Sequence, residues 1–258
     1  DDLLVFTDAD VKAKAYGLIR EALDAGNGLC AKWMPRKGDV AVRLRKYIGW
    51  TPKRYRKTLV DLTKVVETQM CAKDWDNINF SQVPSLAAAR YKKAFNRNTE
   101  AYKAYVAELM KDPKDRTVEV KVNAGAVYPY DVIKGLCGWG FTASFDKTEL
   151  DLITKQWEAL PNYVGDANVL ALVDVSGSMS CPAGKNTKLT CLDVSVSLGL
   201  YLADKNKGKF KDTFLTFSDK PELLHLKGNI NQKIDQMVKS EWGMNTNLNA
   251  AFKKILDV

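Results

Sequence analysis

An apolar run at residues 169–173, followed at once by Asp174-Val175-Ser176-Gly177-Ser178, constrains this chain more than any other segment. Five consecutive apolar residues bounded by polar ones predict a buried strand. Residues 192–203 then repeat apolar side chains at helical spacing, and residues 214–217 form a second apolar run. A strand, a loop, a helix and a strand in this order predict a mostly parallel sheet, with loops at the carboxyl ends of its strands available for ligands.

The chain before this run is predicted to be helical, because apolar residues recur there every three or four positions. Thr51 and Pro52 have the residue types of a helix N-cap and first turn, and the pattern continues from them to Met70. A further stretch starts near Pro84-Ser85 and continues to Leu109. Residues 117–122 alternate like a short strand, and their context leaves that assignment open.

Two regions follow from this reading. We expect a helical region over residues 1–164 and an α/β domain over residues 165–258. Within the second region, further helices are predicted at residues 229–238 and from Asn247 onward.

Composition limits the class of protein. The chain has 258 residues, 46% of them hydrophobic, which is enough to build real cores. It has no apolar run long enough to span a bilayer and lacks the order of a signal peptide, so we expect a soluble, cytoplasmic protein with no membrane partner. Free thiols are the expected state of its five cysteines, and a pair between Cys181 and Cys191 is the alternative.

Oxygen-bearing side chains occupy alternate positions in the turn after residues 169–173. Asp174, Ser176 and Ser178 offer one carboxylate and two hydroxyls, and Gly177 gives the backbone freedom to fold them around an ion. Magnesium prefers hard oxygen ligands in octahedral geometry, so this set suits Mg²⁺. The alternative is that Asp174 caps the turn while the serines bond to nearby backbone groups.

This Asp-x-Ser-x-Ser loop after a strand resembles the metal-ion-dependent adhesion site (MIDAS) of von Willebrand factor A domains. The resemblance implies a doubly wound, mostly parallel α/β fold and assigns Thr246, in Gly243-Met244-Asn245-Thr246-Asn247, as a further ligand of Mg²⁺ or another divalent cation. It also implies an acidic contact after a later strand, and we expect the domain to be incomplete at Val258, where the chain ends first. Asn247 stands where Ro-type members of this family carry an acid.

The order of a helical half and an A-type half resembles the TROVE arrangement of Ro-type RNA-binding proteins, and more closely a set of TROVE-like proteins. The segments that carry this likeness are Ala31-Lys32-Trp33-Met34-Pro35-Arg36 and Val83-Pro84-Ser85. The resemblance implies a ribonucleoprotein component that binds RNA through its helical half.

The positive charge of the chain is concentrated in one segment. The formal net charge is +8, and residues 32–57 contain ten basic residues against the single acid Asp39. We name these ten the basic segment: Lys32, Arg36, Lys37, Arg43, Arg45, Lys46, Lys53, Arg54, Arg56 and Lys57. Four aromatic residues lie among them, Trp33, Tyr47, Trp50 and Tyr55, and could stack on bases. The alternative is a solvated helix face whose aromatic residues fill the core.

Enzyme chemistry has little support in the sequence. The only histidine, His225, lies among leucines and is expected to be packed, and no G-x-S-x-G, phosphate-binding or zinc motif is present. We therefore predict a binding protein and no enzyme. Two function classes remain: RNA binding with a metal-dependent ligand site, or a protein-interaction and assembly module without RNA, in which the cation binds a carboxylate of the partner.

Overall fold

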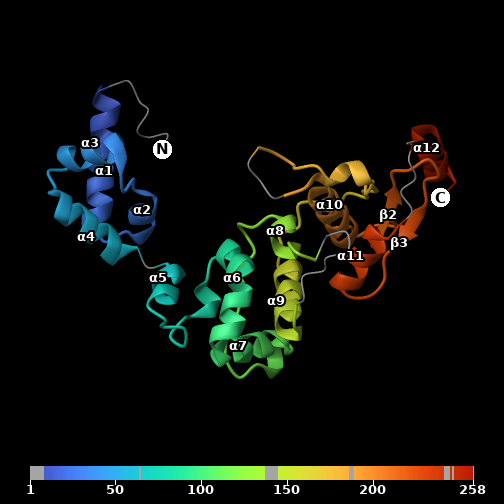
Figure 1. Cartoon of the computed structure of the whole chain (residues 1–258), viewed down its shortest axis with the longest axis horizontal. Coiled ribbons are helices and arrows are strands. Elements are labelled where there is room, and N and C mark those ends of the chain that lie inside the picture. The colour runs from blue at the N-terminus through green and yellow to red at the C-terminus, as the bar shows by residue number, and fades with distance from the viewer. Residues whose placement is uncertain are drawn as a thin grey trace. The chain divides into compact units, whose positions relative to one another are not determined.

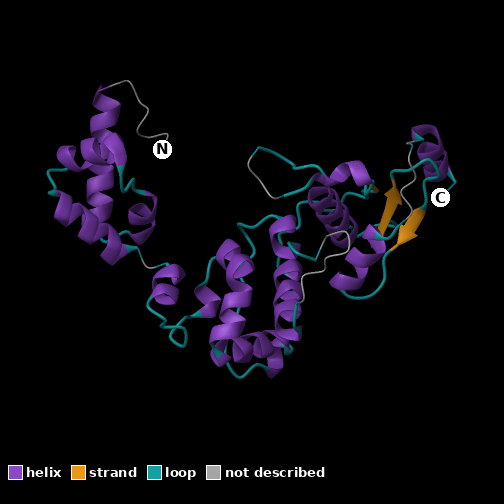
Figure 2. Ribbon diagram, viewed as in Figure 1, coloured by secondary structure: helices purple, strands orange, loops and turns teal. Residues whose placement is uncertain are grey.

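The computed structural model describes residues 9–63, 65–136, 145–185, 189–240, 245 and 247–257. The chain divides into two compact units, residues 1–74 and residues 75–258. Helices make up most of the regular structure in both units (Figure 2). The division into functional regions at residues 164 and 165 stays a prediction.

The described residues of the first unit form five helices: α1 (Ala9–Asp24), α2 (Gly28–Trp33), α3 (Gly38–Tyr47), α4 (Pro52–Leu62) and α5 (Val66–Cys71). The predicted cap is confirmed, because the Thr51 hydroxyl accepts a hydrogen bond from the Arg54 N–H at 3.2 Å and Pro52 begins α4. The prediction that this helical pattern runs unbroken to Met70 is wrong. The backbone leaves the helix at Thr63, with ψ at 84°.

The helical part of the second unit consists of η2 (Phe80–Gln82), α6 (Ser85–Asn98), α7 (Glu100–Met110), η3 (Pro113–Asp115), α8 (Pro129–Ile133) and α9 (Lys147–Glu158). Helices α6, α7 and α8 pack around α9 (Figure 1). The stretch predicted from Pro84 to Leu109 is two helices, because Thr99 is extended and caps α7 through the Ala101 N–H.

Residues 117–122, whose strand assignment was open, form no strand in the structure. Glu108 holds the start of this segment instead. Its carboxylate accepts the Thr117 N–H, the Thr117 hydroxyl at 3.0 Å and the Val118 N–H at 3.4 Å, and it pairs with Lys111 at 2.6 Å. The backbone N–H groups at the start of this segment therefore bond to a side chain of α7 instead of to a neighbouring strand.

These bonds predict a pH dependence of stability. The hydrogen bond from Lys111, followed by that from the Thr117 N–H, lowers the pKa of Glu108 from 4.5 to about 2. A depressed folded-state pKa stabilises the protein fully above the unfolded value of 4.5, and this contribution is lost as the pH falls toward 2. We expect the urea-unfolding free energy of the wild type to fall more steeply over this pH range than that of Glu108→Gln. Glu100→Gln, at an exposed pair with Lys103, should follow the wild type, and identical slopes for all three proteins would contradict the prediction.

The sheet of the second unit has three strands in the described residues: β1 (Ala171–Val173), β2 (Thr213–Thr216) and β3 (Leu223–His225). Strands β1 and β2 are parallel, with Ala171 opposite Phe214, whereas β2 and β3 are antiparallel, with Phe214 opposite Leu224. The surrounding elements are η4 (Gly177–Ser180), α10 (Cys191–Lys205), α11 (Ile230–Val238) and α12 (Leu248–Leu256).

The predicted doubly wound, mostly parallel α/β fold is wrong. The described part of the chain is mostly helical and carries a small mixed sheet, with no complete doubly wound domain. The physical reason lies in the connection lengths. Helix α10 provides the crossover that parallel strands need, but only residues 217–222 join β2 to β3, and so short a link permits only antiparallel pairing.

Helix α10 covers one face of β1. Ala171 and Val173 are buried beneath it, while Leu172 points to the exposed opposite face. The approach is close at Gly199, where an added Cβ would lie 2.5 Å from Val173 Cγ2, so glycine is required there. Trp157 of α9 belongs to the same core. The strand that precedes Asp174 is thus fixed by a rigid helical support.

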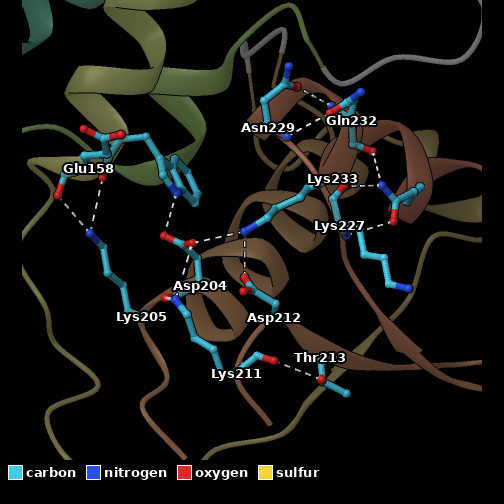
Figure 3. A network of polar contacts seen from close by, with 12 residues as sticks. Glu158, Asp204, Lys205, Lys211, Asp212, Thr213, Lys227, Asn229, Gln232 and Lys233 are labelled. Carbon is cyan, nitrogen blue, oxygen red and sulfur yellow. Dashed lines mark hydrogen bonds and ion pairs between the residues drawn. The ribbon is translucent and has the colours of Figure 1, made fainter. Parts of the chain in front are cut away.

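A network of hydrogen bonds and ion pairs links α9, α10 and α11 (Figure 3). Asp204 of α10 accepts the Trp157 Nε1–H at 3.0 Å and lies 3.4 Å from Lys233 Nζ on α11. Lys233 also pairs with Asp212 at 2.7 Å, just before β2. Lys205 donates to the Glu158 carbonyl at 3.1 Å, at the end of α9.

Removal of the central cation of this network should destabilise the protein. The Lys233 side chain is 16% exposed, and Lys233→Ala leaves the shielded carboxylates of Asp204 and Asp212 without their shared cation. We expect the free energy of unfolding in urea to fall by about 2 kcal/mol, between the values for exposed and buried pairs. Lys239→Ala, at the C-cap of α11, is the matched control: its pair with Asp235 is exposed, and its loss should cost less than about 0.5 kcal/mol. Equal losses in the two variants would contradict this role of the network.

Candidate functional sites

The first candidate site lies where β1 ends. The Phe217 N–H donates to the Val173 carbonyl at 2.9 Å, so β1 and the chain after β2 stay paired up to their carboxyl ends. Asp174 follows β1 directly, and Ser218 follows β2 at the same edge. This is the sheet edge at which the sequence predicted a ligand site.

The turn after β1 brings the predicted side chains together. The Ser176 N–H donates to Asp174 Oδ1 at 2.9 Å, and the hydroxyl oxygens of Ser176 and Ser178 lie 2.9 Å apart. Ser178 belongs to η4 and is exposed, while Asp174 and Ser176 are half-buried. In the part of the chain that the structure describes, Asp174 Oδ2 has no hydrogen-bond partner. One carboxylate oxygen of Asp174 therefore shapes the turn.

Thr246, the fourth predicted ligand, lies outside the described residues, but the next residue is placed. The Asn247 N–H donates to the Ser218 carbonyl at 3.1 Å, and the Asn247 side chain caps α12 through the Ala250 N–H at 2.9 Å. The chain immediately after Thr246 thus lies at the carboxyl end of β2. This contact joins segments far apart in sequence. No local pattern signals it, and only the resemblance implied that residues 243–247 approach the first turn.

The oxygen set suits a small divalent cation. Adjacent ligands of an octahedral Mg²⁺ at about 2.1 Å lie about 3.0 Å from each other, close to the spacing of the two serine hydroxyls. Among the residues that the structure describes, no three or more His, Cys, Asp and Glu side chains gather where they could hold a metal ion. A cation here would therefore depend on one carboxylate supported by hydroxyls.

His225 lies away from this edge. It ends β3 opposite Thr213, at the amino end of β2, and its Nδ1 lies 3.1 Å from the Thr213 hydroxyl. Its side chain is exposed, so the expectation of a packed histidine is wrong.

The basic segment is the second candidate site, on the first unit. Nine of its ten side chains are exposed, and Arg45 is half-buried. Three of them have partners within the unit. Lys32 Nζ lies 5.9 Å from the centroid of the Trp33 ring. Arg54 pairs with Asp24 at 3.3 Å and lies over the Trp50 ring, and Arg36 donates to the Thr63 hydroxyl at 2.9 Å. By contrast Lys53, Arg56 and Lys57 of α4 make no ion pair with any residue described by the structure.

The four aromatic residues of this segment divide into two kinds. Trp33 is 73% exposed and Tyr47 is 52% exposed, so both could stack on a base. Trp50 and Tyr55 are buried in the core of the unit. The Tyr55 hydroxyl donates to the Pro35 carbonyl at 2.9 Å, and burial raises its pKa to about 12. These two residues fill the core, as the alternative interpretation expected of all four.

No helix among the described residues is long and apolar enough to cross a membrane.

The described part of the chain is thus largely helical, and its short mixed sheet supports an Asp-x-Ser-x-Ser turn. The chain belongs to the family described as "Domain of unknown function (DUF2828)", which matches residues 34–170, more than half of the chain. A second family, "Domain of unknown function (DUF7788)", matches residues 168–258 and includes the turn.

A curated relative is "Uncharacterized protein L728" of Acanthamoeba polyphaga mimivirus, 31% identical over 258 residues. The match covers 88% of this chain and 41% of the relative, so the chain spans about two fifths of the length of the protein it resembles. No solved structure matches the chain.

Proposed function

We propose that this protein is a non-enzymatic binding protein that holds a divalent cation with Asp174, Ser176, Ser178 and Thr246. The observation that carries the proposal is the 2.9 Å spacing of the Ser176 and Ser178 hydroxyls beside the carboxylate of Asp174. The bound cation supplies positive charge and a free coordination position for a carboxylate of a protein partner. The resemblance of the turn to the adhesion site of von Willebrand factor A domains supports this assignment, and the assignment does not require a complete domain of that fold.

The contact between Asn247 and Ser218 gives the proposal further support. It holds the residue after Thr246 at the carboxyl end of β2, which is the neighbour of β1. Oxygen ligands from two turns that are distant in sequence would then act at one sheet edge. Site residues on rigid elements are more precisely positioned than residues on long loops, and β1 is held by α10.

Titration of the chelator-treated protein tests the proposal. We expect calorimetry with Mg²⁺, and electron paramagnetic resonance with Mn²⁺, to detect one bound ion per chain. Ser178→Ala should weaken binding by at least about tenfold. Ser180→Ala, in the same short helix η4, is the matched control and should leave binding unchanged. The absence of any bound ion at millimolar concentration would overturn the proposal.

A second function, binding of single-stranded RNA in the cytoplasm through the basic segment, is favoured by one further observation. Lys53, Arg56 and Lys57 are exposed and unpaired among the described residues, and Trp33 offers a stacking face on the same unit. The resemblance to TROVE-like proteins supports the same function. RNA affinity should fall steeply between low and moderate salt, because each phosphate contact releases counterions. No binding even at low salt would leave the protein-interaction module without RNA as the function.

A further inference from the structure

Cys181 and Cys191 face each other across a short antiparallel ladder between η4 and α10. Pro182 pairs with Thr190 in an isolated bridge. On either side of this pair, the Ala183 N–H donates to the Leu189 carbonyl at 2.8 Å and the Cys191 N–H donates to the Cys181 carbonyl at 2.9 Å. This register sets the two cysteines directly opposite each other, and their Sγ atoms are 3.5 Å apart.

The backbone pairing at this position suits a disulfide. Hydrogen-bonded residues on antiparallel strands have Cα atoms about 5.5 Å apart. Disulfides span Cα separations of about 4.4 to 6.8 Å. The two sulfurs need only approach by about 1.5 Å to reach the bond length of about 2.05 Å, and rotation of the side chains suffices for that.

We propose that Cys181 and Cys191 are a modification site, at which a peroxide oxidises the two thiols to a reversible intramolecular disulfide. The Cys181 side chain is exposed and attacks first: its thiolate displaces hydroxide from the peroxide and becomes a sulfenic acid. The half-buried Cys191 thiol then attacks the sulfenic sulfur, the S–S bond forms, and water leaves. Two thiols and one hydrogen peroxide thus give one disulfide and two waters.

The hydrogen bond with Cys181, followed by burial, raises the pKa of the Cys191 thiol, which disfavours the Cys191 thiolate. This order of reaction agrees with the exposure of the two side chains. A thiol reductant reverses the modification by exchange through a mixed disulfide.

The disulfide would tie the proposed cation site to α10. The Cys181 N–H donates to the Ser178 carbonyl at 3.3 Å at the end of η4. Cys191 is the first residue of α10, whose start is fixed by the capping box of Thr190 and Asp193. The oxidised protein should therefore bind Mn²⁺ about three- to tenfold more tightly, because a pre-organised turn loses less freedom on binding. This second effect rests on the proposed function, whereas formation of the disulfide does not.

Peptide mapping of the peroxide-treated chain without reduction tests the proposal. Trypsin cuts after Lys185, between the two cysteines, so the disulfide is expected to join two separate peptides, and dithiothreitol should release them. Cys71→Ser, at an exposed thiol of the first unit, should form the linkage as the wild type does, and Cys191→Ser should not. Oxidation of Cys181 without any Cys181–Cys191 linkage, or linkage only between chains, would overturn the proposal.

Formation of the disulfide and its effect on cation binding are tested separately. A linkage that forms while Ser178→Ala and the wild type both bind no ion would remove the cation site and leave the modification. Equal Mn²⁺ affinity of the oxidised and reduced proteins would remove the coupling between them.

Discussion

Reversal of charge at Lys53, Arg56 and Lys57 is expected to weaken binding of single-stranded RNA by at least about 100-fold at moderate salt. The three positions are spaced i, i+3 and i+4, so their side chains share one face of α4. The substitutions Lys53→Glu, Arg56→Glu and Lys57→Glu each remove a cation that could bind a phosphate and add a negative charge that repels the RNA. The slope of log affinity against log salt should also become shallower by about 0.7 for each phosphate that is no longer neutralised, about 2 in total. Fluorescence anisotropy with a labelled oligouridylate at several salt concentrations measures both effects.

A matched control separates a local surface from the effect of net charge. Lys220, Lys253 and Lys254 are exposed lysines of the second unit, and their replacement by glutamate changes the net charge by the same amount. That variant should retain most of the RNA affinity. Equal losses in the two triple variants would show that only the overall charge attracts RNA and that α4 forms no specific surface.

The features predicted correctly from sequence are those set by neighbouring residues. Thr51, Asn229 and Asn247 each accept an N–H three residues later, so a short pattern suffices to identify the start of a helix. Helix breaks were missed at Thr63 and Thr99. The spacing of apolar residues continues across each break. Such spacing indicates which residues are buried, but it does not reveal a single extended residue between two helices.

The sheet type was not predictable in the same way. Residues 223–226 are three leucines and His225, a short stretch that by itself fits a strand or a loop equally well. Their pairing with β2 depends on the turn at residues 217–222 and on packing within the folded core. Tertiary packing therefore determines the antiparallel edge strand β3, which changes the fold class. By contrast, β1 and α10 could be predicted from local sequence patterns.

The two candidate sites also differ in how far local sequence predicts them. Asp174, Ser176 and Ser178 are brought together by one turn of five residues, so their convergence could be predicted. The sequence could not show which aromatic residues of the basic segment are exposed and which are buried, because Trp33 and Trp50 have the same type and similar neighbours. Only the packing of α2, α3 and α4 decides that the first is exposed and the second buried.

Asp174→Asn is expected to abolish binding of the divalent cation, with a loss of at least about 100-fold, while leaving the fold intact. The asparagine keeps Oδ1, which can still accept the Ser176 N–H that Asp174 accepts at 2.9 Å. The variant therefore retains the cap of the turn and loses only the negative charge. Without cation, its free energy of unfolding in urea should stay within about 0.5 kcal/mol of the wild type, as for other substitutions that preserve the local hydrogen bonds.

This substitution separates the two interpretations of Asp174 because turn capping needs an acceptor and cation binding needs a charge. Asp174→Ala removes both, so it should lose cation binding and also destabilise the turn by about 1 kcal/mol. Asp219→Asn, at an exposed carboxylate after β2, is the control and should bind the cation as the wild type does. Wild-type affinity in Asp174→Asn would mean that the carboxylate serves only as a cap, and the cation site would have to be abandoned.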